Sequence, residues 1–190
     1  MKGPWTLPNF ITLIRLAALP FFLIAIAEGR FGIALGIFVA AGISDGIDGF
    51  LARRFDMRSA LGAYLDPIAD KLLLTSSYVF LAIPSYPGRI KIPVWLVVMV
   101  ISRDFLLLLV GLLLVLASGR KRFPPTWVGK VTTVTQIVTV LLVLCANLWN
   151  WPEELCIIGY GGTATMTVVS GFDYVYRVAR HPEEPAAPAA

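Results

Sequence analysis

Four aspartates stand in two pairs within otherwise apolar sequence: Asp45 with Asp48, and Asp66 with Asp70. A charged side chain at membrane depth costs at least about 2.5 kcal/mol on insertion scales, and neighbouring carboxylates repel one another. A chain that keeps all four therefore needs a cation beside them, and hard divalent ions take oxygen ligands. The aspartates predict one or two Mg²⁺ or Mn²⁺ ions, which could clamp the attacking and leaving oxygens of a phosphoryl transfer.

The spacing within each pair, three residues in the first and four in the second, puts both carboxylates on one face of a helix. Gly49, Ala52 and Gly62 lie beside the pairs, and such small residues let a backbone or a bulky ligand approach closely. Pro67 removes a backbone hydrogen bond inside the third apolar segment, so we expect a kink that aims Asp66 toward the metal.

The composition is that of a membrane protein: 57% of the 190 residues are hydrophobic, only 15% are charged, and the mean hydropathy is +0.78. Soluble domains are nearer 25% charged. The length accommodates about six spanning helices of roughly 20 residues. We expect an all-α polytopic fold with spans at residues 8–27, 31–53, 60–83, 93–117, 126–148 and 154–176. Residues 1–180 would form a single transmembrane catalytic domain, followed by a disordered tail at 181–190.

Basic residues gather on one side of the expected membrane. They include Lys2, Arg53 and Arg54, residues 120–122, and Arg180, whereas the other side has only three. The positive-inside rule then places both termini and the aspartates at the cytoplasm. The net charge of +4 suits anionic lipid rather than nucleic acid. Lys2 and the following apolar run also fit a cleaved secretory signal, but Arg15 interrupts that run and favours a first membrane helix.

Few other residues could take part in catalysis, metal binding or a disulfide. His181 is the only histidine and lies in the polar tail, which excludes a Ser-His-Asp triad or a histidine-based zinc site in the membrane body. The two cysteines, Cys145 and Cys156, lie in apolar sequence and are interpreted as packing residues rather than a disulfide. Trp149 and Trp151 are typical of an aromatic belt at the membrane interface.

The aspartate segment carries a family resemblance. Asp45-x2-Asp48-Gly49-x2-Ala52-Arg53-x8-Gly62-x3-Asp66-x3-Asp70 resembles the signature of the CDP-alcohol phosphatidyltransferase family at all eight fixed positions. Three further segments are similar to the branch that makes phosphatidylglycerophosphate and cardiolipin: Pro8-Asn9-x2-Thr12-x2-Arg15-x4-Pro20, Ile101-Ser102-Arg103-Asp104, and Gly129-Lys130-Val131 with Gln136.

The resemblance implies six transmembrane helices, a homodimer, and a dinuclear Mg²⁺ or Mn²⁺ site open to the cytoplasm, in a bacterial inner membrane. It assigns the metal to Asp45, Asp48, Asp66 and Asp70, with Asp70 also the general base. It assigns the CDP pocket to Gly49, Ala52, Arg53 and Gly62, joined by Asn9 and Thr12. The implied reaction transfers a phosphatidyl group from CDP-diacylglycerol to an alcohol and releases CMP.

The acceptor is expected to be a phosphate-bearing alcohol, because Arg103, Arg120 and Lys130 supply a second basic group. Phosphatidylglycerophosphate synthases often carry a lysine two positions after Lys130, where this chain has Thr132, and the Ile-Ser-Arg-Asp segment resembles eukaryotic-type cardiolipin synthases. We therefore favour phosphatidylglycerol as acceptor, with glycerol 3-phosphate as the alternative.

Structural interpretations stay open beside these assignments. The aspartates could cap helices or pair with nearby arginines, and Arg103 with Asp104 could be an ion pair that fixes helix packing. Residues 120–122 could anchor the chain at the membrane surface, and Lys130 could extend to the interface. Lys71 is interpreted as a counter-ion, and the glycines at 159, 161 and 162 as sites of close packing within the sixth span or at a dimer contact. An ion-coupled transporter or a catalytically inactive scaffold are the rival functions.

Overall fold

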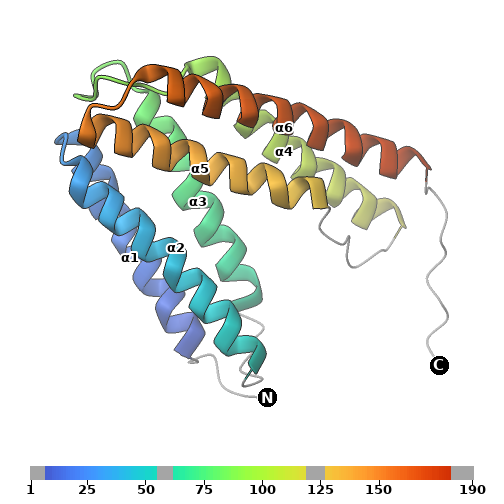
Figure 1. Cartoon of the computed structure of the whole chain (residues 1–190). Helices are drawn as coiled ribbons and strands as arrows, with labels where there is room; N and C mark the ends of the chain where they lie inside the picture. Colours follow the sequence, from blue (N-terminus) through green and yellow to red (C-terminus); the bar gives the residue numbers. More distant parts are fainter. Residues whose placement is uncertain (1–6, 55–61, 119–126, 181–190) are drawn as a thin grey trace.

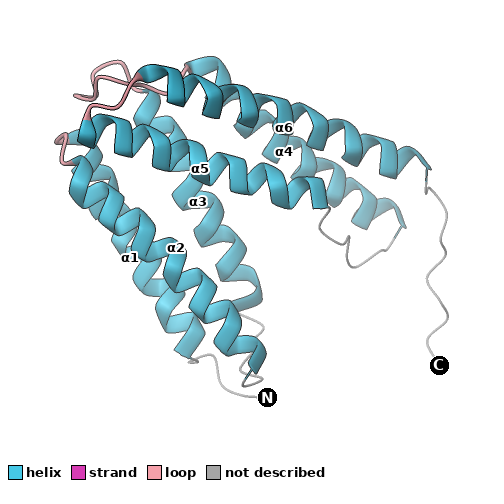
Figure 2. Ribbon diagram, in the orientation of Figure 1, coloured by secondary structure: helices cyan, strands magenta, loops and turns pink. Residues whose placement is uncertain are grey.

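The computed structural model describes residues 7–54, 62–118 and 127–180, and the side chains of residues 10–47, 65–111 and 127–176. Within these ranges the regular structure is helical throughout (Figure 2). The six helices, in order, are α1 (Leu7–Ala27), α2 (Phe31–Arg54), α3 (Gly62–Ala82), α4 (Val94–Ser118), α5 (Trp127–Trp149) and α6 (Glu153–Arg180). They confirm the expected all-α fold and its six segments, with α6 continuing four residues beyond the expected end. The tail at 181–190 lies outside the described residues.

Within the described residues, four helices are long and apolar enough to cross a membrane. Their apolar windows are Phe10–Ala27 in α1, Val94–Gly111 in α4, Trp127–Trp149 in α5 and Glu153–Tyr176 in α6, with mean hydropathies between 1.4 and 2.3. In α2 the described side chains form a further apolar stretch, Phe31–Ile47.

Two of the tight turns between helices are closed by a residue in the left-handed conformation. Gly29 has a φ of 72°, and beyond it Arg30 N–H donates to the carbonyl of Ala25 at 2.8 Å. Asn150 has a φ of 54°, and Trp151 N–H donates to the carbonyl of Ala146 at 3.2 Å. This bond, from the residue after the left-handed one to a carbonyl five residues earlier, is the Schellman ending that glycine and asparagine favour.

The helices are close together at one end of the molecule and spread apart toward the other. α1 packs against α2 and α3, α5 packs against α6, and α4 packs against α3 and α6. The turns after α1, α3 and α5 gather at one end, and from there α1 and α2 run away from α5 and α6 (Figure 1). The end that carries the aspartates is therefore the end at which the helices diverge.

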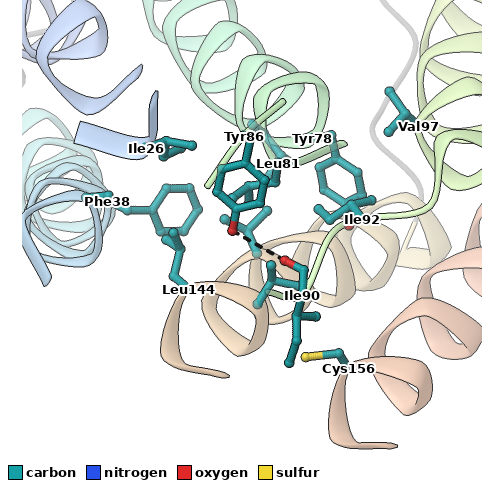
Figure 3. Packing of buried hydrophobic residues seen from close by; sticks show 14 of the residues in the cluster. Ile26, Phe38, Tyr78, Leu81, Tyr86, Ile90, Ile92, Val97, Leu144 and Cys156 are labelled. Carbon is teal, nitrogen blue, oxygen red and sulfur yellow. Dashed lines mark hydrogen bonds between the residues drawn. The ribbon is translucent and has the colours of Figure 1, made fainter. Parts of the chain in front are cut away.

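The apolar core lies at the end where the turns gather, and the segment between α3 and α4 is built into it. Tyr86 and Ile90 of that segment are buried with Phe38 and Leu144 around them (Figure 3). The Tyr86 hydroxyl donates to the carbonyl of Ile90 at 3.3 Å, and burial raises the pKa of Tyr86. Asn147 of α5 closes the contact, since its amide accepts from Ile90 N–H at 3.0 Å and donates to Ile90 carbonyl at 2.9 Å.

The cysteines are confirmed as packing residues: both are free, with Cys156 buried in this core and Cys145 half-buried. The two tryptophans at the end of α5 and in the following turn are exposed and stack on each other, with ring centroids 5.6 Å apart.

A polar seam joins α5 to α6. The hydroxyls of Thr139 and Thr163 lie 2.9 Å apart, and Thr139 also donates to the carbonyl of Gly159 at 3.0 Å. A Cβ at Gly159 would lie 3.1 Å from the Thr139 hydroxyl, so close packing there is confirmed. A Cβ at Gly161 or Gly162 would meet nothing within 4 Å in this chain, so at these two positions close packing against a second copy stays a prediction.

Candidate active site

One buried arginine connects the two aspartate pairs. The Nη1 atom of Arg15, on α1, donates to Asp45 Oδ1 of α2 at 3.1 Å and also to Asp70 Oδ1 of α3. The Arg15 side chain is 3% exposed, whereas those of Asp45 and Asp70 are 46% and 48% exposed. Because a single nitrogen contacts both carboxylates, aspartates from two helices converge on the position of one cation.

Thr12 makes the matching contact to the third described aspartate. Its hydroxyl donates to Asp66 Oδ1 at 2.6 Å, and Thr12 itself is fully buried. Thr12 and Arg15 are three residues apart, so they lie on one face of α1. That face of α1 orients Asp66, Asp70 and Asp45, which explains why a helix with one charged residue in its apolar window contributes to an acidic site.

Several predicted site residues cannot be placed to the level of side chains. Asp48, Gly49, Ala52 and Arg53 lie in α2, Gly62 lies in α3 and Asn9 lies in α1, but their side chains are outside the described part of the chain. Arg120 lies outside the described residues altogether. On the backbone, Asp48 comes just under one turn of α2 after Asp45, as its spacing predicted.

The described carboxylates suit a divalent metal by their chemistry, although they do not form a complete ligand set. Among the side chains described, no three Asp, Glu, His or Cys residues are arranged to hold a metal ion, and Asp48 is not among those side chains. What supports a cation here is that Asp45 and Asp70 already share one guanidinium nitrogen. Carboxylate oxygens are the ligands that Mg²⁺ and Mn²⁺ prefer. The metal assignment therefore stays a prediction.

A second group of charged side chains joins α3, α4 and α6. Lys71 pairs with Asp104 Oδ2 at 2.5 Å, Arg103 pairs with Asp104 Oδ1 at 2.8 Å, and Arg103 also donates to the hydroxyl of Ser170. Lys71 is thus confirmed as a counter-ion. The Arg103–Asp104 ion pair is present, so Arg103 has a structural role whatever it binds in addition.

The predicted acceptor residues do not meet within the described structure. Arg103 lies in the middle of α4, whereas Lys130 lies in the first turn of α5, is exposed, and has its Nζ 5.9 Å from the ring centroid of Trp127. That position agrees with a lysine that extends to the membrane interface. An acceptor role for Arg103, Arg120 or Lys130 stays a prediction.

Comparison with known proteins decides the family. A family model described as CDP-alcohol phosphatidyltransferase matches residues 5–170, which include every described contact of the site. The chain belongs to this family. The family and the four apolar helices together make the chain an integral membrane protein.

The relatives within the CDP-alcohol phosphatidyltransferase family carry two different names. The human cardiolipin synthase (CMP-forming) is 35% identical over 92% of this chain, and the chain spans 62% of the length of that protein. The Bacillus subtilis CDP-diacylglycerol–glycerol-3-phosphate 3-phosphatidyltransferase is 33% identical over 90% of this chain and 93% of its own length. The Streptomyces coelicolor cardiolipin synthase (CMP-forming) is 33% identical over 92% of this chain and 83% of its own length.

Sequence reasoning missed the main structural role of Arg15. It treated Arg15 as an interruption of the first apolar run and as part of an N-terminal family segment, and it assigned the neutralisation of the aspartates to metal. The signal was present, because Arg15 is the only charged residue of the window Phe10–Ala27, and a lone intramembrane charge calls for a partner. Ser170, which receives a hydrogen bond from Arg103, carried no comparable signal among the many hydroxyl residues of α5 and α6.

Proposed function

We propose that this chain transfers a phosphatidyl group from CDP-diacylglycerol to phosphatidylglycerol and releases CMP. The observation that carries the proposal is the convergence of Asp45 and Asp70, from two helices, on one buried cation. These carboxylates are half-exposed, so a ligand can reach them, and they belong to the signature of the family to which the chain belongs. The human and Streptomyces relatives named as CMP-forming synthases support the same products.

In the proposed reaction the acceptor hydroxyl oxygen attacks the phosphorus that bears the diacylglycerol. A new P–O bond forms, the P–O bond to CMP breaks, and CMP leaves with that electron pair. Asp70 accepts the proton of the hydroxyl, a role that its exposed carboxylate allows. Arg15 holds Asp70 beside Asp45, and Thr12 holds Asp66. Two Mg²⁺ or Mn²⁺ ions bound by Asp45, Asp48, Asp66 and Asp70 would offset the negative charge of the diphosphate.

Phosphatidylglycerol is favoured over glycerol 3-phosphate by the surroundings of Thr132. This position, where the glycerol-3-phosphate enzymes often carry a lysine, is fully buried. Its hydroxyl lies 2.8 Å from the carbonyl of Val128 and 3.1 Å from that of Met166 on α6. Thr132 therefore supplies no positive charge to a soluble phosphate. Since relatives of similar identity carry both names, glycerol 3-phosphate is the alternative acceptor.

The test is CMP release from CDP-diacylglycerol by the purified protein with Mn²⁺, with phosphatidylglycerol and glycerol 3-phosphate offered separately. We expect CMP and cardiolipin with phosphatidylglycerol, and loss of both in Asp70→Asn. Glu28→Gln, which changes an exposed carboxylate at the far end of α1, is the control and should retain activity. CMP release with glycerol 3-phosphate alone would establish the alternative. Ion movement without CMP release from either acceptor would favour a transporter, and neither activity would favour a scaffold.

The remaining features of the proposal follow from the same scheme. We propose that the protein lies in a bacterial inner membrane, with its aspartates and both termini at the cytoplasm, the side on which the positive-inside rule puts the basic residues. We propose a homodimer, as the resemblance implies. Chemical crosslinking in lipid nanodiscs tests the dimer, and labelling of single cysteines introduced near residue 180 in intact cells tests the orientation.

A further inference from the structure

Two neighbouring residues of α3 are held by two different helices. Asp70 accepts a hydrogen bond from Arg15 of α1. Lys71, the next residue, donates to Asp104 Oδ2 of α4 at 2.5 Å. Successive residues of a helix point about 100° apart, and α3 packs against both α1 and α4. The two contacts therefore restrain the rotation of α3 about its axis at Asp70, the general base of the proposed reaction.

Asp104 is held in place by groups other than Lys71. Its side chain is only 14% exposed, and its second oxygen, Oδ1, accepts from Arg103 at 2.8 Å. Arg103 is 9% exposed and also donates to the hydroxyl of Ser170 on α6, which is buried. Two helices, α4 and α6, thus fix the carboxylate to which Lys71 is bonded.

The turn of α3 that carries the aspartates depends on side-chain contacts more than an ordinary turn does. Pro67 lies inside α3 and has no backbone N–H, so one hydrogen bond of the helix is missing there. Asp66 and Asp70 face α1, which donates a hydrogen bond to each of them. Lys71 adds a restraint from a second direction, toward α4.

The ion pair of Lys71 with Asp104 is expected to contribute little to stability. Lys71 is 45% exposed, and water weakens an ion pair that has an exposed partner. The placement of a catalytic group, in contrast, has a large effect on rate, because a displacement of about 1 Å can cost on the order of a hundredfold. The contact can therefore matter for turnover without mattering for folding.

We propose that Asp104, acting through Lys71, positions the Asp70 carboxylate to accept the proton of the acceptor hydroxyl. Asp104 and Lys71 are positioning residues, since Asp70 alone of the three contacts the reacting group. The inference rests on the proposed function and adds two residues to it. It gives the charged contacts among α3, α4 and α6 a role in the reaction that does not require α4 or α6 to bind substrate.

The experiment measures CMP release by the full chain in nanodiscs at saturating Mn²⁺, together with the Tm of each variant. Lys71→Met removes the ammonium group and keeps most of the side chain, whereas Lys71→Arg keeps a cation that can reach Asp104. The matched control is Lys91→Met, because the Lys91 ammonium donates to the carbonyl of Pro84 beyond the far end of α3. Asp104→Asn removes the other partner of the contact.

We expect kcat to fall about tenfold to a hundredfold in Lys71→Met, with KM for CDP-diacylglycerol and Tm unchanged. Lys71→Arg should restore most of the rate, and Lys91→Met should not alter it. Asp104→Asn should lower kcat by a similar factor when it is assayed well below its Tm. Adding Lys71→Met to Asp104→Asn should have no further effect, because both substitutions break the same contact.

A second measurement needs no turnover. Arg15→Met and Lys71→Met each remove one of the contacts that hold this turn of α3, so in each single variant the other contact partly compensates. The Tm of the double variant should therefore fall about 2–4 °C further than the sum of the two single changes.

Three outcomes would overturn the inference. A higher KM for CDP-diacylglycerol with unchanged kcat in Lys71→Met would make Lys71 a substrate-binding residue. Full activity in Lys71→Met would show that the contact does not position Asp70. Additive changes in Tm would show that Arg15 and Lys71 do not restrain the same turn. Failure of the proposed function is a separate result: a native protein without CMP release, but with the non-additive Tm, would remove the reaction and leave Asp104 and Lys71 as the groups that position Asp70.

Discussion

Removal of the Arg15 guanidinium tests how the carboxylates are held. Arg15→Met keeps an unbranched chain of similar length but leaves Asp45 and Asp70 without their shared donor. A charge pair about 4 Å apart near a protein surface interacts by about 4 kcal/mol at an effective dielectric constant of 20. Both carboxylates are almost half-exposed, so water replaces much of that interaction. We estimate a loss of about 3 kcal/mol for the two pairs together.

For a chain of this size about 3 kcal/mol corresponds to a fall in Tm of about 6–12 °C. The assay is thermal unfolding of the detergent-purified protein, followed by tryptophan fluorescence. The matched control is Arg30→Met, because Arg30 lies just beyond the same helix, is 62% exposed, and pairs with Glu28 at only 3.7 Å. An exposed pair of this kind contributes between about 0 and 1 kcal/mol, so the control should change Tm by at most about 2 °C.

The same samples test the metal without measuring turnover. A ligand at one hundred times its Kd stabilises a fold by about 2.7 kcal/mol. Mn²⁺ should therefore raise the Tm of the native protein, and raise that of Arg15→Met further because the freed carboxylates lack another cation. An Arg15→Met protein as stable as the native one would refute the bridging role. A Mn²⁺ effect that survives unchanged in Asp45→Asn would place the metal elsewhere.

Three further predictions concern stability, each measured as a change in Tm. Gly159→Val should lower Tm by several degrees, because its Cβ would lie 3.1 Å from the Thr139 hydroxyl and separate α5 from α6. Gly88→Ala should lower Tm by several degrees, since its Cβ would overlap the buried Tyr86 ring, at 2.0 Å from Cζ. Asp104→Asn should cost about 3 kcal/mol, because it leaves Arg103 buried without a counter-ion.

Matched substitutions at open positions provide the controls for these three predictions. Gly162→Val on α6 and Gly36→Ala on α2 add the same atoms where nothing lies within 4 Å, so neither should change Tm by more than about 2 °C. For Asp104→Asn the control is Lys71→Met. It removes the more exposed of the two cations that pair with Asp104 and leaves the Arg103–Asp104 pair intact. A Tm equal to that of its control would contradict the reasoning in each case.

The helices and the location of the acidic site could be predicted because they depend on local pattern. Apolar runs of about 20 residues predict membrane helices wherever they occur, and spacings of three or four residues fix which side chains share a helix face. Asp45 and Asp70 were therefore expected to meet. The contact of both aspartates with Arg15 was not expected, because the sequence does not show that α1 packs against both α2 and α3.

The glycines of α6 show a feature of packing that the sequence could not predict. Gly159, Gly161 and Gly162 look equivalent in the sequence, and small residues in a membrane helix favour close packing. Successive residues of a helix point about 100° apart, so only one of the three faces Thr139 of α5. Which one does so depends on the rotation of α6 about its axis, and that rotation is set by contacts such as Thr139 with Thr163.

The two ends of the molecule are stabilised by different interactions, and the difference bears on function. Where the turns gather, buried apolar side chains and hydrogen bonds to backbone carbonyls hold the helices, as at Asn147 and Ile90. Where the helices diverge, charged contacts hold them, with Arg15 between Asp45 and Asp70. Charged groups can exchange a protein partner for a metal ion or a phosphate, which an apolar contact cannot do. The carboxylates that hold the diverging helices are thus the carboxylates that we propose bind the metal ions, so we expect metal binding to change the contacts of Arg15 on α1 with α2 and α3.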